Sequence, residues 1–115
     1  MKLKKSAKAC DEACAKVAAS DFKSSDPRLV RLNDLLQGME QTLTYSKGLP
    51  GREWYRHMIY APGMHTGYGV KTLPGVREAI EQRRWPEAEQ YMTIIAGVLN
   101  AYSERLDEAA AVLKQ

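Results

Sequence analysis

The residues best suited to chemistry in this 115-residue chain are two cysteines and two histidines. Cys10 and Cys14 lie four residues apart, whereas His57 and His65 lie in a stretch rich in glycine. Together they offer the ligand types of a tetrahedral zinc site. The spacing argues against such a site, because structural ligands usually come from tight knuckles and this cysteine pair lies on an apolar helical stripe. We therefore predict no metal site and no other cofactor.

No catalytic motif is present in the sequence. The chain lacks a nucleophile elbow, an HExxH pair and a phosphate-binding loop. Most of its 14 acidic residues lie on predicted polar helix faces, as Glu87 and Glu104 do. The two histidines are suited to acid–base work, but irregular backbone needs hydrogen-bond partners, so we expect each imidazole to anchor the backbone around it. The sequence predicts that the chain alone is not an enzyme.

Net charge and apolar content argue against two further classes of partner, nucleic acids and membranes. The net charge is +3, and the lysines that crowd the first eight residues accompany no nucleic-acid-binding motif. The start MKLKKSAKAC has no apolar segment after it that would make a signal peptide, and no run of about 20 apolar residues occurs. We therefore expect no nucleic-acid partner and no membrane contact by this chain, and the sequence indicates no compartment.

Four segments have the apolar spacing of helices. The first covers residues 3–17, and the second begins at an Asp26–Pro27 cap and continues to Leu43. A short third segment opens at Pro74, and a long fourth one opens at Pro86. Apolar positions that alternate by three and four residues are typical of bundle helices. We predict an all-α four-helix bundle, with three long helices and one short helix, as a single domain over residues 1–115.

The second and fourth segments have the strongest apolar stripes, so we expect them to form the core. The short third segment contributes a smaller apolar set. The positions concerned are Leu29, Leu32, Leu36, Met39 and Leu43, then Val76, Ala79 and Ile80, then Met92, Ile95, Leu99, Tyr102, Leu106, Ala109 and Leu113.

A long irregular stretch separates the second and third segments, over residues 45–73. Its later part, residues 57–75, reads HMIYAPGMHTGYGVKTLPG and holds four glycines. Loops of this length in a small domain are usually functional or disordered, and the aromatic content favours an ordered loop. Tyr68 lies between Gly67 and Gly69, whose permissive backbone favours presentation of the ring at a contact site.

Two runs carry a family resemblance: GLPGREWYRHMIYAPG at residues 48–63 and HTGYGVKTLPGVREAI at residues 65–80. They resemble the C-terminal helical domain of the glutamate carboxypeptidase II and transferrin receptor group, the transferrin-receptor-like dimerisation domain. The resemblance is dense over residues 26–113, and the loop is most similar to bacterial members. It implies a bundle that follows a zinc-peptidase domain and forms the main contact between two subunits. The zinc ligands and the catalytic glutamate of such proteins lie in the peptidase domain, outside this chain.

The resemblance also implies a substrate contact in the long loop. In glutamate carboxypeptidase II, a lysine–tyrosine pair there binds the substrate's C-terminal glutamate. Tyr68 matches that tyrosine, Gly67 stands at the lysine position, and Thr66 stands at the preceding asparagine position. Without the lysine, a strict preference for glutamate does not follow. His65 matches a neighbouring family histidine, for which we expect no catalytic role.

Three functions remain open at this point. The first is a homodimerisation module that also contacts a zinc peptidase domain in a parent protein. The second is a fragment of an M28-type zinc metallopeptidase whose loop around Tyr68 helps to form the substrate pocket. The third is an isolated monomeric scaffold. The mass of the chain in solution discriminates between the first and the third.

Overall fold

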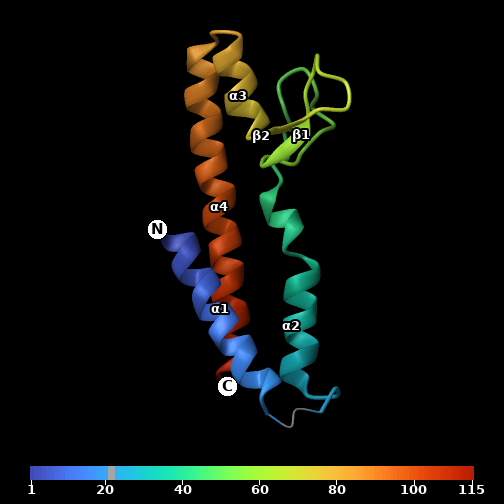
Figure 1. Cartoon of the computed structure of the whole chain (residues 1–115), viewed down its shortest axis with the longest axis vertical. Helices are drawn as coiled ribbons and strands as arrows, with labels where there is room; N and C mark the ends of the chain where they lie inside the picture. The colour runs from blue at the N-terminus through green and yellow to red at the C-terminus, as the bar shows by residue number, and fades with distance from the viewer. Residues whose placement is uncertain (21–22) are drawn as a thin grey trace. The chain divides into compact units, whose positions relative to one another are not determined.

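Most of the chain is helical in the computed structural model, which describes residues 1–20 and 23–115. The described part contains four α-helices, as the sequence predicts, and also a small two-stranded sheet that the sequence pattern did not predict (Figure 1). None of the described helices is long and apolar enough to cross a membrane. The elements are α1 (Lys2–Ala18), α2 (Pro27–Gln37), the 3₁₀-helix η1 (Glu40–Leu43), β1 (Tyr60–Pro62), β2 (Val70–Thr72), α3 (Pro74–Glu81) and α4 (Trp85–Leu113).

The chain divides into two compact units, and α4 contributes to both. We call Met1–Thr42 together with Asn100–Gln115 the terminal unit, and Leu43–Leu99 the central unit. Each unit has an apolar core of its own.

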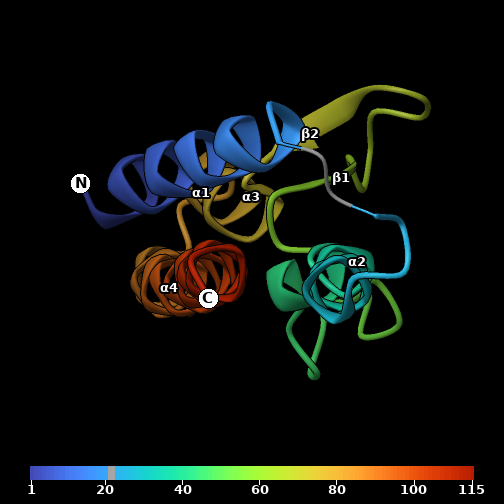
Figure 2. The same ribbon diagram turned by 90° about the horizontal axis from the view of Figure 1, so that it is seen from below.

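The terminal unit consists of α1, α2 and the C-terminal part of α4. Figure 2 shows α2 and α4 nearly end-on, with α1 inclined to both. The start of α2 follows the predicted cap, because Asp26 Oδ1 accepts a hydrogen bond of 2.8 Å from the Arg28 amide and Pro27 occupies the first helical turn. Hydrogen bonds from Arg28 also lower the pKa of the Asp26 carboxyl. The buried core residues are Cys10, Ala13, Leu32, Leu35, Ala109, Ala110 and Leu113.

The predicted second helix was too long. It ends at Gln37 rather than Leu43, and a 3₁₀-helix over Glu40–Leu43 follows it. Gly38 stands at the break, where its low helix propensity favours an end. The buried face also differs from the predicted stripe: Leu35 is 1% exposed, whereas Leu36 is 44% exposed. Leu35 and Leu36 lie three and four residues after buried Leu32, so helical spacing alone did not decide which of them is buried.

The central unit combines α3, the N-terminal part of α4 and the segment over residues 43–73. Its buried core residues are Leu49, Met58, Ala61, Tyr91, Ile95 and Val98. Ile95 is buried as predicted, and Leu99 is partly buried against this core. Ile80 and Met92 are about half exposed, so the predicted stripe fails at these two positions.

Backbone hydrogen bonds tie the segment over residues 43–73 to itself. The Met58 amide donates to the Leu43 carbonyl at 2.9 Å, and the Leu73 amide donates to the Ile59 carbonyl at 2.7 Å. Gly48 adopts a positive φ of 69°, and a Cβ atom there would lie 2.2 Å from the Glu53 carbonyl oxygen. The backbone therefore passes itself at a distance that only glycine permits.

Candidate functional site

The hairpin of β1 and β2 carries Tyr68 in its connecting loop. The strands are antiparallel, and Pro62 pairs with Val70 at the end next to the loop. The Gly63 amide donates to the Gly69 carbonyl at 3.1 Å, which closes the loop at its root. The Tyr68 side chain is fully exposed. We call residues 63–69 the hairpin loop.

Thr66 and Gly67 shape the hairpin loop from within. The Thr66 hydroxyl donates to the Gly69 carbonyl at 3.3 Å, and the Gly69 amide donates back to the Thr66 carbonyl at 3.3 Å. Gly67 has a φ of 61°, in the left-handed region that favours glycine. A Cβ atom on Gly63 would lie 2.0 Å from the Thr66 hydroxyl oxygen, so the hydroxyl occupies the interior of the turn.

A buried ion pair lies at the root of the hairpin loop. Arg52 donates from Nη2 to Glu78 Oε2 and from Nη1 to the Pro62 carbonyl, both at 2.5 Å. Glu78 Oε1 accepts from the Met64 amide at 2.8 Å. The Arg52 and Glu78 side chains are only 11% and 7% exposed. Sequence reasoning missed this pair, although Glu78 falls in the helical period of buried Pro74 and Gly75, where a charged residue signals a buried partner.

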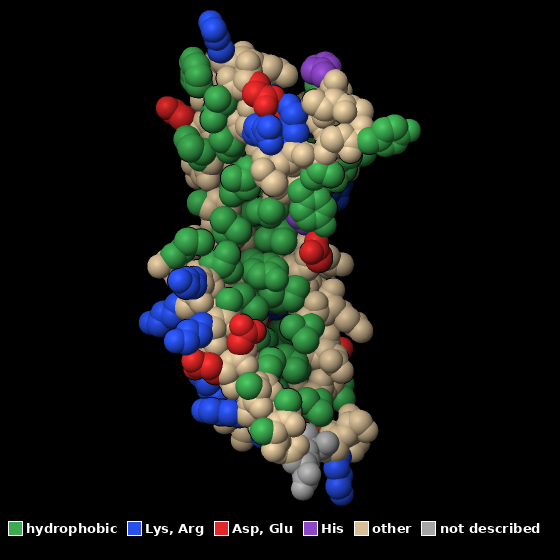
Figure 3. Space-filling view, viewed as in Figure 1, with side chains coloured by type: hydrophobic (Ala, Val, Ile, Leu, Met, Phe, Trp, Pro, Cys, Tyr) green, Lys and Arg blue, Asp and Glu red, His purple; other side chains and the backbone are tan. Residues whose placement is uncertain are grey.

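A second polar contact joins β2 to α3. Lys71 donates to Glu81, which also accepts from Arg77 at 3.2 Å. The hydrogen bond from Lys71 is the main cause that lowers the pKa of the Glu81 carboxyl, and Arg77 adds to it. Figure 3 shows acidic and basic side chains together where α3 meets the hairpin. The hairpin is thus attached to α3 directly by Lys71 of β2, and from Pro62 of β1 by way of Arg52.

The two histidines differ in their surroundings. His57 Nδ1 accepts from the amides of Ile59 at 3.3 Å and Tyr60 at 3.4 Å, and its ring packs on the Tyr60 ring at a centroid distance of 4.1 Å. The prediction that His57 anchors irregular backbone is confirmed. His65 is instead exposed in the hairpin loop.

The cysteines belong to the apolar core of the terminal unit. Cys10 is buried, and burial raises the pKa of its thiol to about 11. Cys14 is partly buried against the same core. Among residues 1–20 and 23–115, no three potential metal ligands of the His, Cys, Asp and Glu types lie close together.

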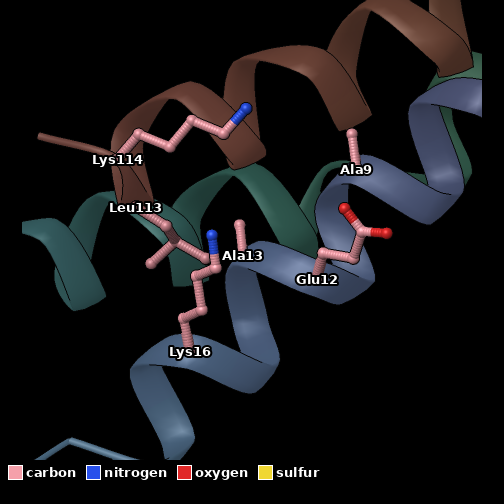
Figure 4. A pocket seen from close by; sticks show the side chains of 6 residues that line it. All are labelled: Ala9, Glu12, Ala13, Lys16, Leu113 and Lys114. Atoms are coloured by element: carbon pink, nitrogen blue, oxygen red, sulfur yellow. The ribbon is translucent and has the colours of Figure 1, made fainter.

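One hollow on the terminal unit is lined by residues from α1 and from the end of the chain. Figure 4 shows that the hollow brings two lysines and a glutamate around small apolar side chains. Its volume is about 360 Å³, and none of the predicted site residues lines it. The lining residues are Ala9, Glu12, Ala13, Lys16, Leu113 and Lys114.

Large apolar side chains are exposed on α3 and α4. Trp85 at the start of α4 is 55% exposed, and Met92, seven residues later, is 52% exposed. That spacing places both on one side of the helix. Ile80 on the preceding helix is 47% exposed. We call Ile80, Trp85 and Met92 the α3–α4 face.

Several known proteins match part of this chain. The sequence is 36% identical over 77 residues to a probable glutamate carboxypeptidase of Arthroderma benhamiae, covering 61% of this chain. It is 35% identical over 83 residues to the probable glutamate carboxypeptidase LAMP1 of Arabidopsis thaliana, covering 72% of this chain. A third match, 33% identical over 54 residues, is the inactive zinc metalloprotease C354.09c of Schizosaccharomyces pombe, with 47% of this chain and 7% of that protein covered.

These matches cover only a small part of the relatives. The aligned region spans 11% of the Arthroderma protein and 12% of the Arabidopsis protein. The family described as the transferrin receptor-like dimerisation domain matches residues 1–107, which is most of the chain. This match includes α1, α2, the hairpin, α3 and most of α4. The chain therefore belongs to the transferrin receptor-like dimerisation domain family.

Proposed function

We propose that the chain is a homodimerisation module of a peptidase-like protein and has no catalytic machinery of its own. The observation that carries this proposal is the match to a dimerisation-domain family over residues 1–107. Relatives named as probable glutamate carboxypeptidases and as an inactive zinc metalloprotease support a parent protein of the peptidase type. In this proposal residues 1–115 fold as one domain, and a zinc peptidase domain of the parent is a second partner.

The α3–α4 face is the surface that we assign to the second copy. A two-fold dimer buries the same patch on both subunits, so the patch must be complementary to itself. Trp85 and Met92 are the residue types enriched in the cores of protein interfaces. Paired charges lie close to these residues in the sequence, because Arg84 forms an ion pair with Glu87 and Arg77 forms one with Glu81. A face with an apolar centre and a rim of both charge signs is compatible with contact to itself.

Light scattering over a hundredfold concentration range, with reductant present, tests the dimer. We expect a mass of twice 12.9 kDa at the upper concentrations. Trp85→Ser should weaken association at least tenfold. Truncation of a tryptophan buried in an interface often costs about 2 kcal/mol or more of binding free energy. Trp54→Ser is the matched control, since Trp54 is exposed in the same unit but lies outside the α3–α4 face. A monomeric wild type at every concentration would leave the monomeric scaffold as the correct description.

A second candidate function concerns Tyr68. In an M28-type zinc metallopeptidase parent, the hairpin loop would help to form the substrate pocket, and the Tyr68 hydroxyl would donate to a substrate carboxylate. The full exposure of this tyrosine on a hairpin attached to α3 favours the role. Thr66 and Gly67 would set the turn that presents it, because the Thr66 hydroxyl is already bonded within the loop.

The Tyr68 role is tested by adding the chain to a peptidase domain of the parent type and measuring dipeptide hydrolysis. Tyr68→Phe removes only the hydroxyl and should raise KM. Tyr60→Phe is the control, because Tyr60 is also exposed on the hairpin but lies in β1 rather than in the loop. Equal KM values for Tyr68→Phe and the wild type would exclude the substrate contact.

A further inference from the structure

We propose that Arg52 and Glu78 are positioning residues that fix the direction in which the hairpin loop presents Tyr68. This inference rests on the proposed contact role of Tyr68, but its test does not require that Tyr68 bind anything. Neither residue belongs to the hairpin. Arg52 lies in the irregular segment before it, and Glu78 lies on α3 after it.

The hydrogen bonds of this pair converge on the point where the chain leaves β1. Arg52 donates a hydrogen bond to the carbonyl of Pro62, the last residue of β1. Glu78 accepts a hydrogen bond from the amide of Met64. Gly63 lies between them and donates to Gly69 across the loop. Three consecutive residues therefore have their backbone fixed at the root of the loop. A fixed root determines where the rest of a short closed loop points.

Side-chain geometry explains why these two residue types are needed. The guanidinium of Arg52 uses two nitrogens for acceptors on two different elements, which the single ammonium of a lysine cannot reproduce with the same planar geometry. The two oxygens of Glu78 likewise serve two different donors. The result is a continuous series of hydrogen bonds from the Pro62 carbonyl through Arg52 and Glu78 to the Met64 amide.

Burial gives the pair its influence on the loop. Both side chains are about nine-tenths buried, so each charge depends on the other for compensation. Loss of one partner leaves the other as an uncompensated charge, and the surrounding backbone must open to admit water. The hairpin loop begins beside the pair, and its residues 64–69 are all exposed. We therefore expect loss of the pair to loosen this loop before it affects the helices.

Backbone ¹⁵N relaxation of the full chain measures that loosening residue by residue. In the wild type the order parameters of the amides at positions 63–69 should be near those of rigid backbone, about 0.85, and in Glu78→Gln they should fall below about 0.6. The amides of α1 and α2 should keep their values. Glu89→Gln is the matched control, because Glu89 is an exposed glutamate on α4, and it should change neither set.

Arg52→Lys distinguishes positioning from simple charge compensation. The lysine keeps a positive charge near Glu78 but lacks the fork that reaches Pro62. If the pair positions the loop, Arg52→Lys loosens positions 63–69 as Glu78→Gln does. Unchanged order parameters in the loop of either variant would overturn the proposal. If Glu78→Gln does not fold, the relaxation of Arg52→Lys decides the matter by the same two outcomes.

Discussion

The terminal unit and the central unit build their cores by different means. In the terminal unit, the described residues of the main buried cluster all lie on α1, α2 or α4, so this cluster forms where helix faces pack together. In the central unit, Leu49 and Met58 lie outside helices and strands, and Ala61 lies in β1. One core therefore depends on helical periodicity, and the other depends on how irregular backbone folds around α4.

Tyr91 shows what the second kind of core requires. Its hydroxyl donates to the buried Gly48 carbonyl at 2.8 Å, and burial raises the pKa of that hydroxyl. Its ring lies where a Cβ atom on Gly75 would approach the ring carbon Cδ1 at 2.2 Å. A single α4 side chain thus contacts the irregular segment and the start of α3. The packing of the central unit therefore depends on glycine at positions 48 and 75 as well as on buried apolar side chains.

The largest effect should come from emptying either core. We expect Leu35→Ala in the terminal unit and Ile95→Ala in the central unit each to lower the free energy of unfolding by about 2 to 5 kcal/mol, because both side chains are buried. Urea unfolding followed by circular dichroism measures this change.

The shape of the same unfolding curves sharpens the comparison between the units. If residues 1–115 fold as one domain, both variants keep a single transition. Two separate transitions in either variant would contradict the single domain, because they would mean that one unit unfolds while the other persists.

A smaller but still large effect should follow from Gly48→Ala, which tests the irregular segment alone. The substitution combines a positive φ with a Cβ placed against the Glu53 backbone. Together these should cost about 2 to 4 kcal/mol of unfolding free energy, from left-handed strain and overpacking. Thermal unfolding measures it. A variant as stable as the wild type would mean that the turn at Gly48 can rearrange without cost.

Features set by local geometry or by helical period were predicted from the sequence, whereas contacts made by the irregular segment were not. The starts of α2 and α3 were identified from Asp26–Pro27 and Pro74, because capping and proline geometry are local properties. Burial of Ile95 followed from its helical period. The Arg52–Glu78 pair was not predicted, because its partners are 26 residues apart and only the folded irregular segment brings them together. The hairpin was also missed, since strands of three residues are too short to show alternation.

In the terminal unit, thiol chemistry reports how well the core excludes water. Because burial raises the pKa of Cys10 to about 11, its thiolate fraction at pH 8 should be roughly a hundredfold below that of an unperturbed thiol. A Cys14→Ser variant keeps the burial that is the largest cause of the raised pKa, so Ellman's reagent should react with its Cys10 much more slowly than in urea. The rate should rise about tenfold per pH unit as long as the pH stays below the raised pKa.

The same raised pKa has a consequence for stability. A thiol that keeps its proton longer when folded stabilises the protein below the unfolded pKa, and this contribution is lost as the pH rises towards 11. We therefore expect the protein, with reductant present, to become easier to unfold between pH 9 and 11. Fast labelling of Cys10 at pH 8, at the rate seen in urea, would show that the terminal core is open to solvent.

The smallest effect, and the opposite sign, should come from Gly97→Ala. Gly97 lies within α4, and a Cβ atom there would meet nothing within 4 Å. Alanine should therefore stabilise the chain by about 0.5 to 1 kcal/mol, since glycine in a helix costs that much in conformational entropy. Thermal unfolding of Gly97→Ala and of Gly48→Ala under the same conditions compares the stability cost of two glycine substitutions within the central unit. If Gly97→Ala destabilised the chain as Gly48→Ala should, the cost of replacing glycine in this unit would not come from turn geometry.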